Sequence, residues 1–126
     1  MGRIEFHNGL DIPGFVGAPV KATASGKVLN TLWAGGYGLM VIIDHGNGFK
    51  TIYAHLDNYM VKPGDKVVKG QIIAHCGSTG LSTGPHVHYE IRYYNKPVNP
   101  NAFLDLSIFK MNKVLYKVRK KRWAKK

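Results

Sequence analysis

Two histidines separated by a single residue, His86 and His88, are the first groups in this sequence that could do chemistry. In an extended strand, residues two apart point to the same face, while Val87, Tyr89 and Ile91 would point to the other. Two neighbouring imidazoles can both bind a metal ion, or one can bind it while the other transfers protons. This spacing also arises by chance, so a metal site requires further ligands elsewhere in the chain.

Candidate ligands stand near the N-terminus, where His7 and Asp11 form an H-x-x-x-D element. Imidazole nitrogen and carboxylate oxygen both bind zinc, and a catalytic zinc ion typically has three protein ligands and one water. His7, Asp11 and one histidine of the 86/88 pair would complete that set, and we expect Gly9 to let the backbone fold sharply between them. Each residue alone is more simply a surface or turn residue. The two elements together favour a single zinc site.

His55 lies in a β-prone segment, 53–56, and a strand histidine is more often structural than catalytic. Beside a second histidine that does not bind the metal, it would act as a general base or stabilise a developing oxyanion. We exclude His45, in a predicted turn, and His75 from the site. The single cysteine, Cys76, cannot form an internal disulfide bond, and we predict that it is a small buried residue at a strand end.

Glycine accounts for 15 of the 126 residues and divides the chain into short β-prone pieces, which predicts an all-β domain. A strand is predicted over residues 26–33, followed by a hairpin formed by 40–44 and 49–55. The connection contains Asn47-Gly48, a pair favoured in tight hairpins because both central turn positions need positive φ. The glycine-rich loop 77–84 leads into the His86/His88 strand, and we expect it to shape a substrate groove.

Two stretches, 19–28 and 61–73, share a pattern of short strands separated by turns. Both resemble half-motifs of the hybrid barrel-sandwich that biotinyl and lipoyl carrier domains adopt. A carrier function is rejected, because the nearest candidate lysine, Lys66, lies in the wrong part of the motif.

The composition changes after residue 104, which divides the chain into a domain, 1–104, and a basic segment, 105–126. The segment holds nine of the 18 Lys and Arg residues and accounts for most of the net charge of +11. Its apolar residues recur near helical spacing, which predicts an amphipathic helix over 105–122. We expect this helix to pack on the domain, on a protein partner or on a second copy of the chain. Anionic envelope surfaces rank second, and no nucleic acid partner is expected.

Taken together, the motifs resemble the lysostaphin-type (LytM) zinc metallopeptidases of family M23 over about residues 3–104. The resemblance is carried by the H-x-x-x-D element, Gly-Gly-Tyr-Gly, Asp-His-Gly-Asn-Gly, the 53–56 strand, the run 78–90 and Pro-Val-Asn-Pro at 97–100. It implies a LytM-type hybrid barrel-sandwich of antiparallel sheets. It also implies one zinc ion bound by His7, Asp11 and His88. His55 and His86 would be the catalytic histidines that do not bind the metal.

The activity implied by the resemblance is zinc-dependent endopeptidase hydrolysis of peptide crosslinks in bacterial peptidoglycan, with D,D-crosslinks favoured over glycyl-glycine bonds. The alternative is a non-catalytic LytM module that activates or scaffolds a cell-wall hydrolase, which the presence of all five site residues disfavours. The implied location is the bacterial cell envelope, either periplasmic or extracellular. Because the sequence shows neither a secretory signal nor an apolar run long enough to span a bilayer, we expect any targeting segment to lie upstream.

Overall fold

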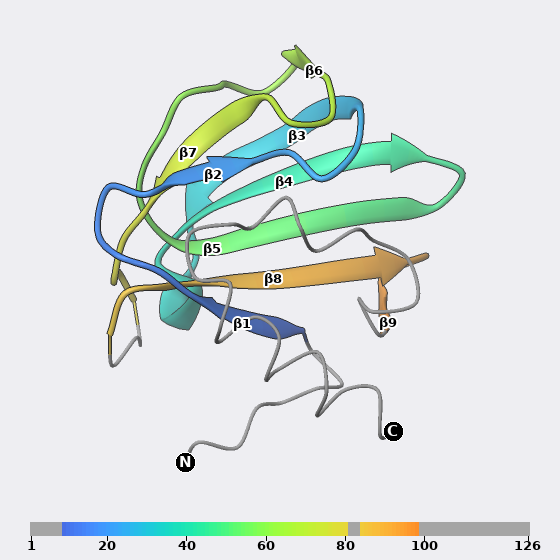
Figure 1. Ribbon diagram of the computed structural model, residues 1–126. Coiled ribbons are helices and arrows are strands. Elements are labelled where there is room, and N and C mark those ends of the chain that lie inside the picture. The colour runs from blue at the N-terminus through green and yellow to red at the C-terminus, as the bar shows by residue number, and fades with distance from the viewer. Residues whose placement is uncertain (1–8, 81–83, 99–126) are drawn as a thin grey trace.

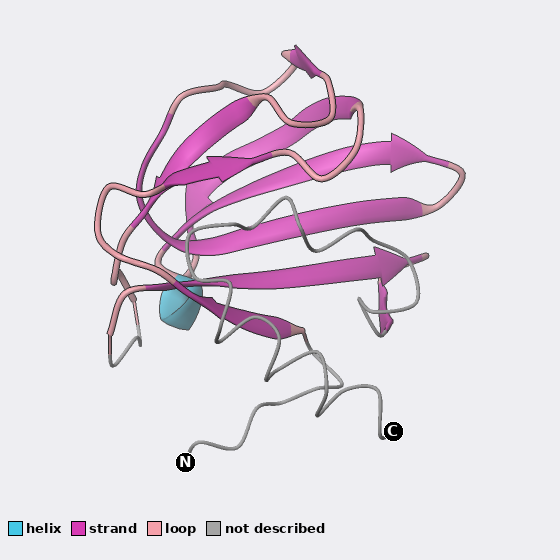
Figure 2. Ribbon diagram, in the orientation of Figure 1, coloured by secondary structure: helices cyan, strands magenta, loops and turns pink. Residues whose placement is uncertain are grey.

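The computed structural model describes residues 9–80 and 84–98, and within them it forms one antiparallel sheet system of nine strands (Figure 1). The strands are β1 (Leu10–Pro13), β2 (Pro19–Lys21), β3 (Gly26–Trp33), β4 (Leu39–Gly46), β5 (Phe49–Tyr59), β6 (Lys66–Val67), β7 (Ile72–Cys76), β8 (His86–Tyr93) and β9 (Lys96–Val98). The single helix of the described residues is a one-turn 3₁₀ helix, Gly35–Tyr37 (Figure 2). The all-β prediction is confirmed. His7 and the helix predicted over 105–122 lie outside the described residues.

The main sheet has the strand order β1-β8-β5-β4-β3-β6. Three strands lie off this path: β7 pairs with β5, β2 pairs with β7, and β9 pairs with β8. Strand β7 pairs with the last residues of β5, from Leu56 to Tyr59, and β2 pairs with β7. Buried side chains from β2 and β7 join those of β3, β4, β5 and β8 in one hydrophobic core. The inner face of the main sheet is therefore covered by a second, smaller layer (Figure 1). No helix in the described residues is long and apolar enough to cross a membrane.

Alternation along β8 places its apolar side chains in the core and its two histidines on the opposite face. Val87, Tyr89 and Ile91 belong to the inner core, with exposed fractions of 0%, 0% and 4%. Because side chains alternate along a strand, His86 and His88 point to the outer face. The apolar layer on that face is thin: Met40, Ile52 and Ala54 form a separate small cluster with partly buried neighbours.

The local sequence signals account for the strand connections. In the β4–β5 hairpin Asn47 has φ of 53° and Gly48 has φ of 87°, as the Asn-Gly pair predicted. The predicted strand 26–33 coincides with β3, whereas β5 continues four residues beyond the predicted end at His55. The two half-motifs pair with each other, β2 with β7 and β3 with β6, which explains their shared pattern.

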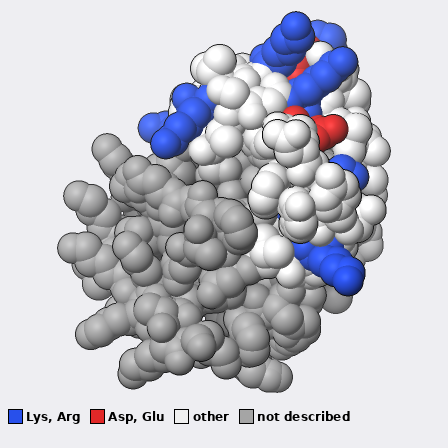
Figure 3. Space-filling model, turned by 90° about the vertical axis from the view of Figure 1, so that its right-hand side faces the viewer, with Lys and Arg blue, Asp and Glu red and all other residues white. Residues whose placement is uncertain are grey.

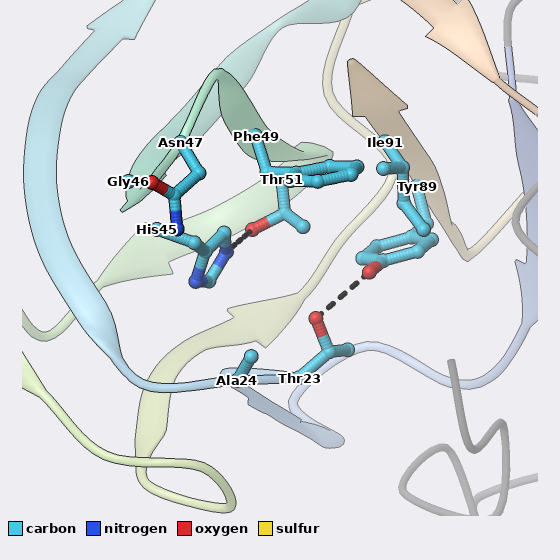
Figure 4. A pocket seen from close by; sticks show the side chains of 9 residues that line it. All are labelled: Thr23, Ala24, His45, Gly46, Asn47, Phe49, Thr51, Tyr89 and Ile91. Carbon is cyan, nitrogen blue, oxygen red and sulfur yellow. Dashed lines mark hydrogen bonds between the residues drawn. The ribbon is translucent and has the colours of Figure 1, made fainter. Parts of the chain in front are cut away.

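A cavity of about 270 Å³ opens on the inner side of the sheet, lined in part by Phe49, Tyr89 and Ile91 (Figure 4). Its polar groups are bonded to one another: His45 Nε2 lies 2.7 Å from Thr51 Oγ1, and Tyr89 shares a 2.7 Å hydrogen bond with a threonine hydroxyl. None of the predicted site residues lines it. The cavity therefore belongs to the core side of β8, away from the two histidines of that strand.

Charged groups project at the surface on the face shown in Figure 3. Among the described Asp, Glu, Lys and Arg residues, Glu90 is the one that is buried, with an exposed fraction of 0%. It stands on β8 two residues beyond His88 and therefore on the outer face as well. A buried carboxylate requires compensating donors, so its surroundings are part of the site described below.

Cys76, at the end of β7, is fully buried, as the sequence predicted. Burial raises the pKa of its thiol from 9.0 to about 11. Because the thiolate is the reactive form, we expect no modification of the native protein by a disulfide reagent such as DTNB at pH 8, and rapid modification in urea. The release of the chromophore in the two conditions measures this. Equal rates in both would show that the β7 end opens readily.

Candidate active site

The pairing of β1 with β8 brings Asp11 to the histidines. The register places Asp11 opposite His88, and Leu10 and Ile12, each 1% exposed, anchor β1 in the core. Asp11 therefore points to the outer face, where its Oδ1 lies 2.8 Å from His88 Nδ1 and 3.6 Å from His86 Nε2. The structure thus brings these three sequence-predicted residues together on one face of the sheet.

Gly9 lies where the chain comes into close contact with β8. A Cβ atom at this position would collide with the carbonyl oxygen of Tyr89 and lie 2.7 Å from Cγ of Glu90. Glycine is needed because the backbone of β1 must approach β8 closely enough for Asp11 to reach His88.

His55 reaches the outer face through a β-bulge in β5. Between the pairs Val41–Tyr53 and Leu39–Leu56, two residues of β5 face one residue of β4. His55 has φ of 62°, a left-handed conformation that costs a non-glycine residue about 1 kcal/mol or more. Its ring centroid lies 4.8 Å from that of His86 and 6.1 Å from that of His88. The bulge thus redirects a side chain that simple alternation would send to the core.

Backbone carbonyls fix the tautomers of the two predicted catalytic histidines. His55 Nδ1 lies 2.7 Å from the carbonyl oxygen of Thr79, and His86 Nδ1 lies 2.9 Å from that of Gly84. A carbonyl oxygen only accepts, so each Nδ1 carries the proton and donates it. In the neutral rings, Nε2 is therefore the basic nitrogen of both residues.

The pKa of His55 is lowered from its ordinary value. Burial is the main cause, and positive charge on His86 or His88 lowers the pKa further, against the opposing effect of the Thr79 carbonyl. His55 is consequently neutral near pH 7, which is the form that accepts a proton.

His88 lies between two carboxylates. Its Nδ1 contacts Asp11, and its Nε2 lies 2.8 Å from Oε2 of Glu90. Burial alone would lower the pKa of His88, but these hydrogen bonds and the negative charges of both carboxylates raise it to about 9. For Glu90, burial alone would raise the pKa, because it too disfavours the charged form. The hydrogen bonds from His88 and Arg92 outweigh this effect and keep the pKa below its ordinary value. The outer face therefore concentrates negative charge around one imidazole.

Thr79, which the sequence analysis did not single out, joins the glycine-rich loop to the site. Its hydroxyl donates to the carbonyl of Leu56 at 2.7 Å and accepts from the backbone N–H of Leu39 at 3.1 Å. A Cβ atom on Gly38 would lie 2.5 Å from Thr79 Oγ1, and one on Gly80 equally close to the Gly38 nitrogen. These glycines let two loops meet backbone to backbone beside His55.

The donor set fits a metal ion, although the described part of the chain holds no group of three His, Cys, Asp or Glu side chains arranged around one point. Asp11 and His88 present an oxygen and a nitrogen to each other, and they are two of the three predicted ligands. The third, His7, lies outside the described residues. The second nitrogen of His88 contacts a carboxylate, an arrangement typical of histidines that bind zinc.

Glu90 and Tyr37 are further site residues that the sequence analysis missed. Tyr37 donates from its hydroxyl to Glu90 Oε2 at 2.9 Å, and its ring lies 5.7 Å from that of His88. Extending the two-residue period from His86 and His88 would have placed Glu90 on the same face. Tyr37 belongs to the Gly-Gly-Tyr-Gly element that the sequence analysis noted, but only a long-range contact brings it to the site.

Sheet and site together define a lysostaphin-type (LytM) peptidase domain. The catalytic domain of lysostaphin from Staphylococcus simulans has a TM-score of 0.73 and 38% identity, over 77% of either chain. A zinc-containing peptidase from Vibrio cholerae has a TM-score of 0.72 and 43% identity, over 79% of this chain and 31% of the other. The sequence model of peptidase family M23 matches residues 5–100, and the chain belongs to this family.

Among the relatives of known sequence is the peptidoglycan DD-endopeptidase ShyB of Vibrio cholerae, which is 45% identical over 101 residues. The match covers 78% of this chain and 23% of ShyB, so the chain spans about a quarter of that relative's length. The similarity to ShyB is therefore confined to the M23 domain.

The environment of His88 predicts that the stability of the metal-free protein falls as the pH rises. The folded pKa of about 9 exceeds the ordinary value of 6.5, so the imidazolium stabilises the fold fully below pH 6.5. This contribution is lost as the pH rises towards and through 9. Urea denaturation of chelator-treated protein at pH 6, 7.5 and 9 should show a decreasing free energy of unfolding. A His88→Gln variant should show a weaker decrease, and an unchanged slope in that variant would assign the effect to other groups.

Proposed function

We propose that the chain is a zinc-dependent endopeptidase that hydrolyses peptide crosslinks in bacterial peptidoglycan. The observation that carries the proposal is the convergence of Asp11, His55, His86 and His88 on one face of the sheet, with the basic nitrogens of His55 and His86 fixed by backbone carbonyls. In this assignment His7, Asp11 and His88 bind one zinc ion. His55 and His86 are the catalytic histidines.

A bound zinc ion would supply hydroxide near neutral pH by lowering the pKa of its water. The chain's own contribution is proton transfer. His86 Nε2 lies 3.6 Å from the carboxylate of Asp11 and so faces the predicted ligands, where a neutral imidazole can accept a proton from the attacking water. A protonated His86 or His55 then donates a hydrogen bond to the oxygen of the peptide carbonyl as negative charge develops on it.

The two catalytic histidines lie too close together to be charged at the same time without cost. Their ring centroids are 4.8 Å apart, and a charge on His86 lowers the pKa of His55. One proton shared between the two rings would leave one base and one donor available, as hydrolysis of an amide requires.

The similarity to ShyB, a peptidoglycan DD-endopeptidase, supports peptidoglycan as the substrate and favours D,D-crosslinks over glycyl-glycine bonds. Such a substrate lies in the bacterial cell envelope, which is the proposed location. The partners proposed beyond the substrate are a protein, or a second copy of the chain, bound by residues 105–126.

Substitution of either catalytic histidine tests the proposed mechanism. We expect His86→Ala and His55→Ala to lower the rate of hydrolysis of purified peptidoglycan by about 10²-fold or more, since each removes a proton-transfer group. Zinc content measured by atomic absorption should stay unchanged, because neither residue is a proposed ligand.

His75→Ala is the matched control for these variants. His75 accepts or donates one hydrogen bond with Asn58 at 2.9 Å and does not contact the site, so the activity should be retained. Full hydrolysis by the His86→Ala variant would contradict the assigned role of His86. Unchanged biological function in that variant, with no hydrolysis of purified peptidoglycan by the wild-type protein, would instead favour a non-catalytic module that acts through another hydrolase.

Digestion of muropeptides identifies the scissile bond. We expect mass spectrometry to show cleavage of D,D-crosslinked dimers and no cleavage of pentaglycine-bridged ones. A chelator should abolish the products and added zinc should restore them. Cleavage restricted to glycine bridges would contradict the substrate assignment while leaving the metallopeptidase assignment intact.

A further inference from the structure

Glu90 is the one buried acidic or basic residue of the described chain that directly contacts a proposed zinc ligand. It stands on β8 opposite Ile52 of β5, on the face that carries only a thin apolar layer. An apolar residue at this position would enlarge that layer at no cost in desolvated charge. The presence of a carboxylate here therefore calls for a functional explanation.

Four donors saturate this carboxylate. Oε2 accepts from His88 Nε2 at 2.8 Å and from the Tyr37 hydroxyl at 2.9 Å. Oε1 accepts from Arg92 Nε at 2.8 Å and from Arg92 Nη2 at 2.6 Å. Both Arg92 nitrogens contact the same oxygen, Oε1, so Oε2 is left to His88 and Tyr37. Contacts on both oxygens hold the carboxylate in place, and its position sets the direction in which His88 Nε2 must point.

We propose that Glu90 is a positioning residue of the zinc site, which holds the proton of His88 on Nε2 and so presents Nδ1, on the side of Asp11, to the metal. Arg92 and Tyr37 hold Glu90 in place for this purpose. The inference rests on the proposed function, because it assigns a role in binding the proposed zinc ion. It adds residues to the site that bind neither the metal nor the substrate.

The physical basis is that neutral imidazole has two tautomers. Either nitrogen can bind zinc, and the hydrogen bond made by the other nitrogen decides which one does. A carboxylate in this position also increases the basicity of the ligand, and its removal typically weakens metal binding by about 10- to 100-fold. Tyr37 extends the effect to the Gly35–Tyr37 turn, because its hydroxyl and His88 share one oxygen of Glu90.

Glu90→Gln tests the role with little change in volume. The amide has one acceptor oxygen, so it cannot accept from His88 and from Arg92 as the two carboxylate oxygens do. We expect the zinc dissociation constant, measured by competition with a chromophoric chelator, to rise by about 10- to 100-fold. An unchanged dissociation constant would overturn the proposal.

Thr51→Val is the matched control, which tests whether a loss of fold stability alone weakens zinc binding. Thr51 is 5% exposed, lies on the neighbouring strand β5 and makes its hydrogen bonds on the inner side, to Tyr53 and His45. This variant should lower the urea midpoint without changing zinc affinity. A weakening of zinc binding equal to that of Glu90→Gln would mean that Glu90 acts only through the stability of the fold.

The wild-type protein provides a second measurement that does not depend on the variant folding. In the zinc-loaded protein, ¹⁵N–¹H correlation spectra of the imidazole rings should show His88 with a protonated Nε2 and a metal-bound Nδ1. Metal bound at Nε2 would overturn the inference and leave the proposed function standing. Failure of the wild-type protein to bind zinc at all would instead overturn the proposed function.

Discussion

The pairing of β8 with β1 and β5 is the constraint on which the site depends. Strand β8 lies between β1 and β5, so that Asp11, His88 and Ala54 stand in one row across three strands. Side chains alternate with a period of two, and a slip of one residue would send Asp11 into the core and Ile12 to the surface. The buried residues of β1 and β8 therefore specify the register, and the register brings the carboxylate to the imidazole.

One site residue violates this regular alternation. His55 reaches the outer face because a bulge inserts an extra residue into β5 and because its backbone adopts a positive φ. The conformation is unfavourable for histidine and persists only if its surroundings hold it. The hydrogen bond to the Thr79 carbonyl holds the His55 ring, and the Thr79 hydroxyl is itself bonded to Leu39 at the start of β4 and to Leu56 within β5.

These two features explain how far the sequence alone could lead. Hairpin turns and strand alternation follow from local patterns, which depend on residues close together in the chain. The grouping of Asp11 with His88, 77 positions apart, was predicted instead from the ligand types that a zinc site needs and from the family resemblance. The bulge at His55 leaves no local signal, since neither Ala54 nor His55 is a residue that turns require. The contact of Tyr37 with Glu90 joins residues 53 positions apart, and the close approach that makes Gly9 necessary appears only when β1 and β8 are paired. His7 and the predicted helix over 105–122 stay predictions.

The two faces of the sheet differ in what they contribute. The inner face carries the main core and its buried hydroxyl network, which includes Thr23, Tyr53 and Tyr89 and contacts no predicted site residue. The outer face has few apolar side chains, so the site residues there are held mainly by directed hydrogen bonds to carbonyls and carboxylates. Such bonds fix the orientation of each ring more narrowly than apolar packing would, because they act only along defined directions. Apolar packing on the inner face thus stabilises the fold, and hydrogen bonds on the outer face orient the groups proposed to bind a metal and transfer protons.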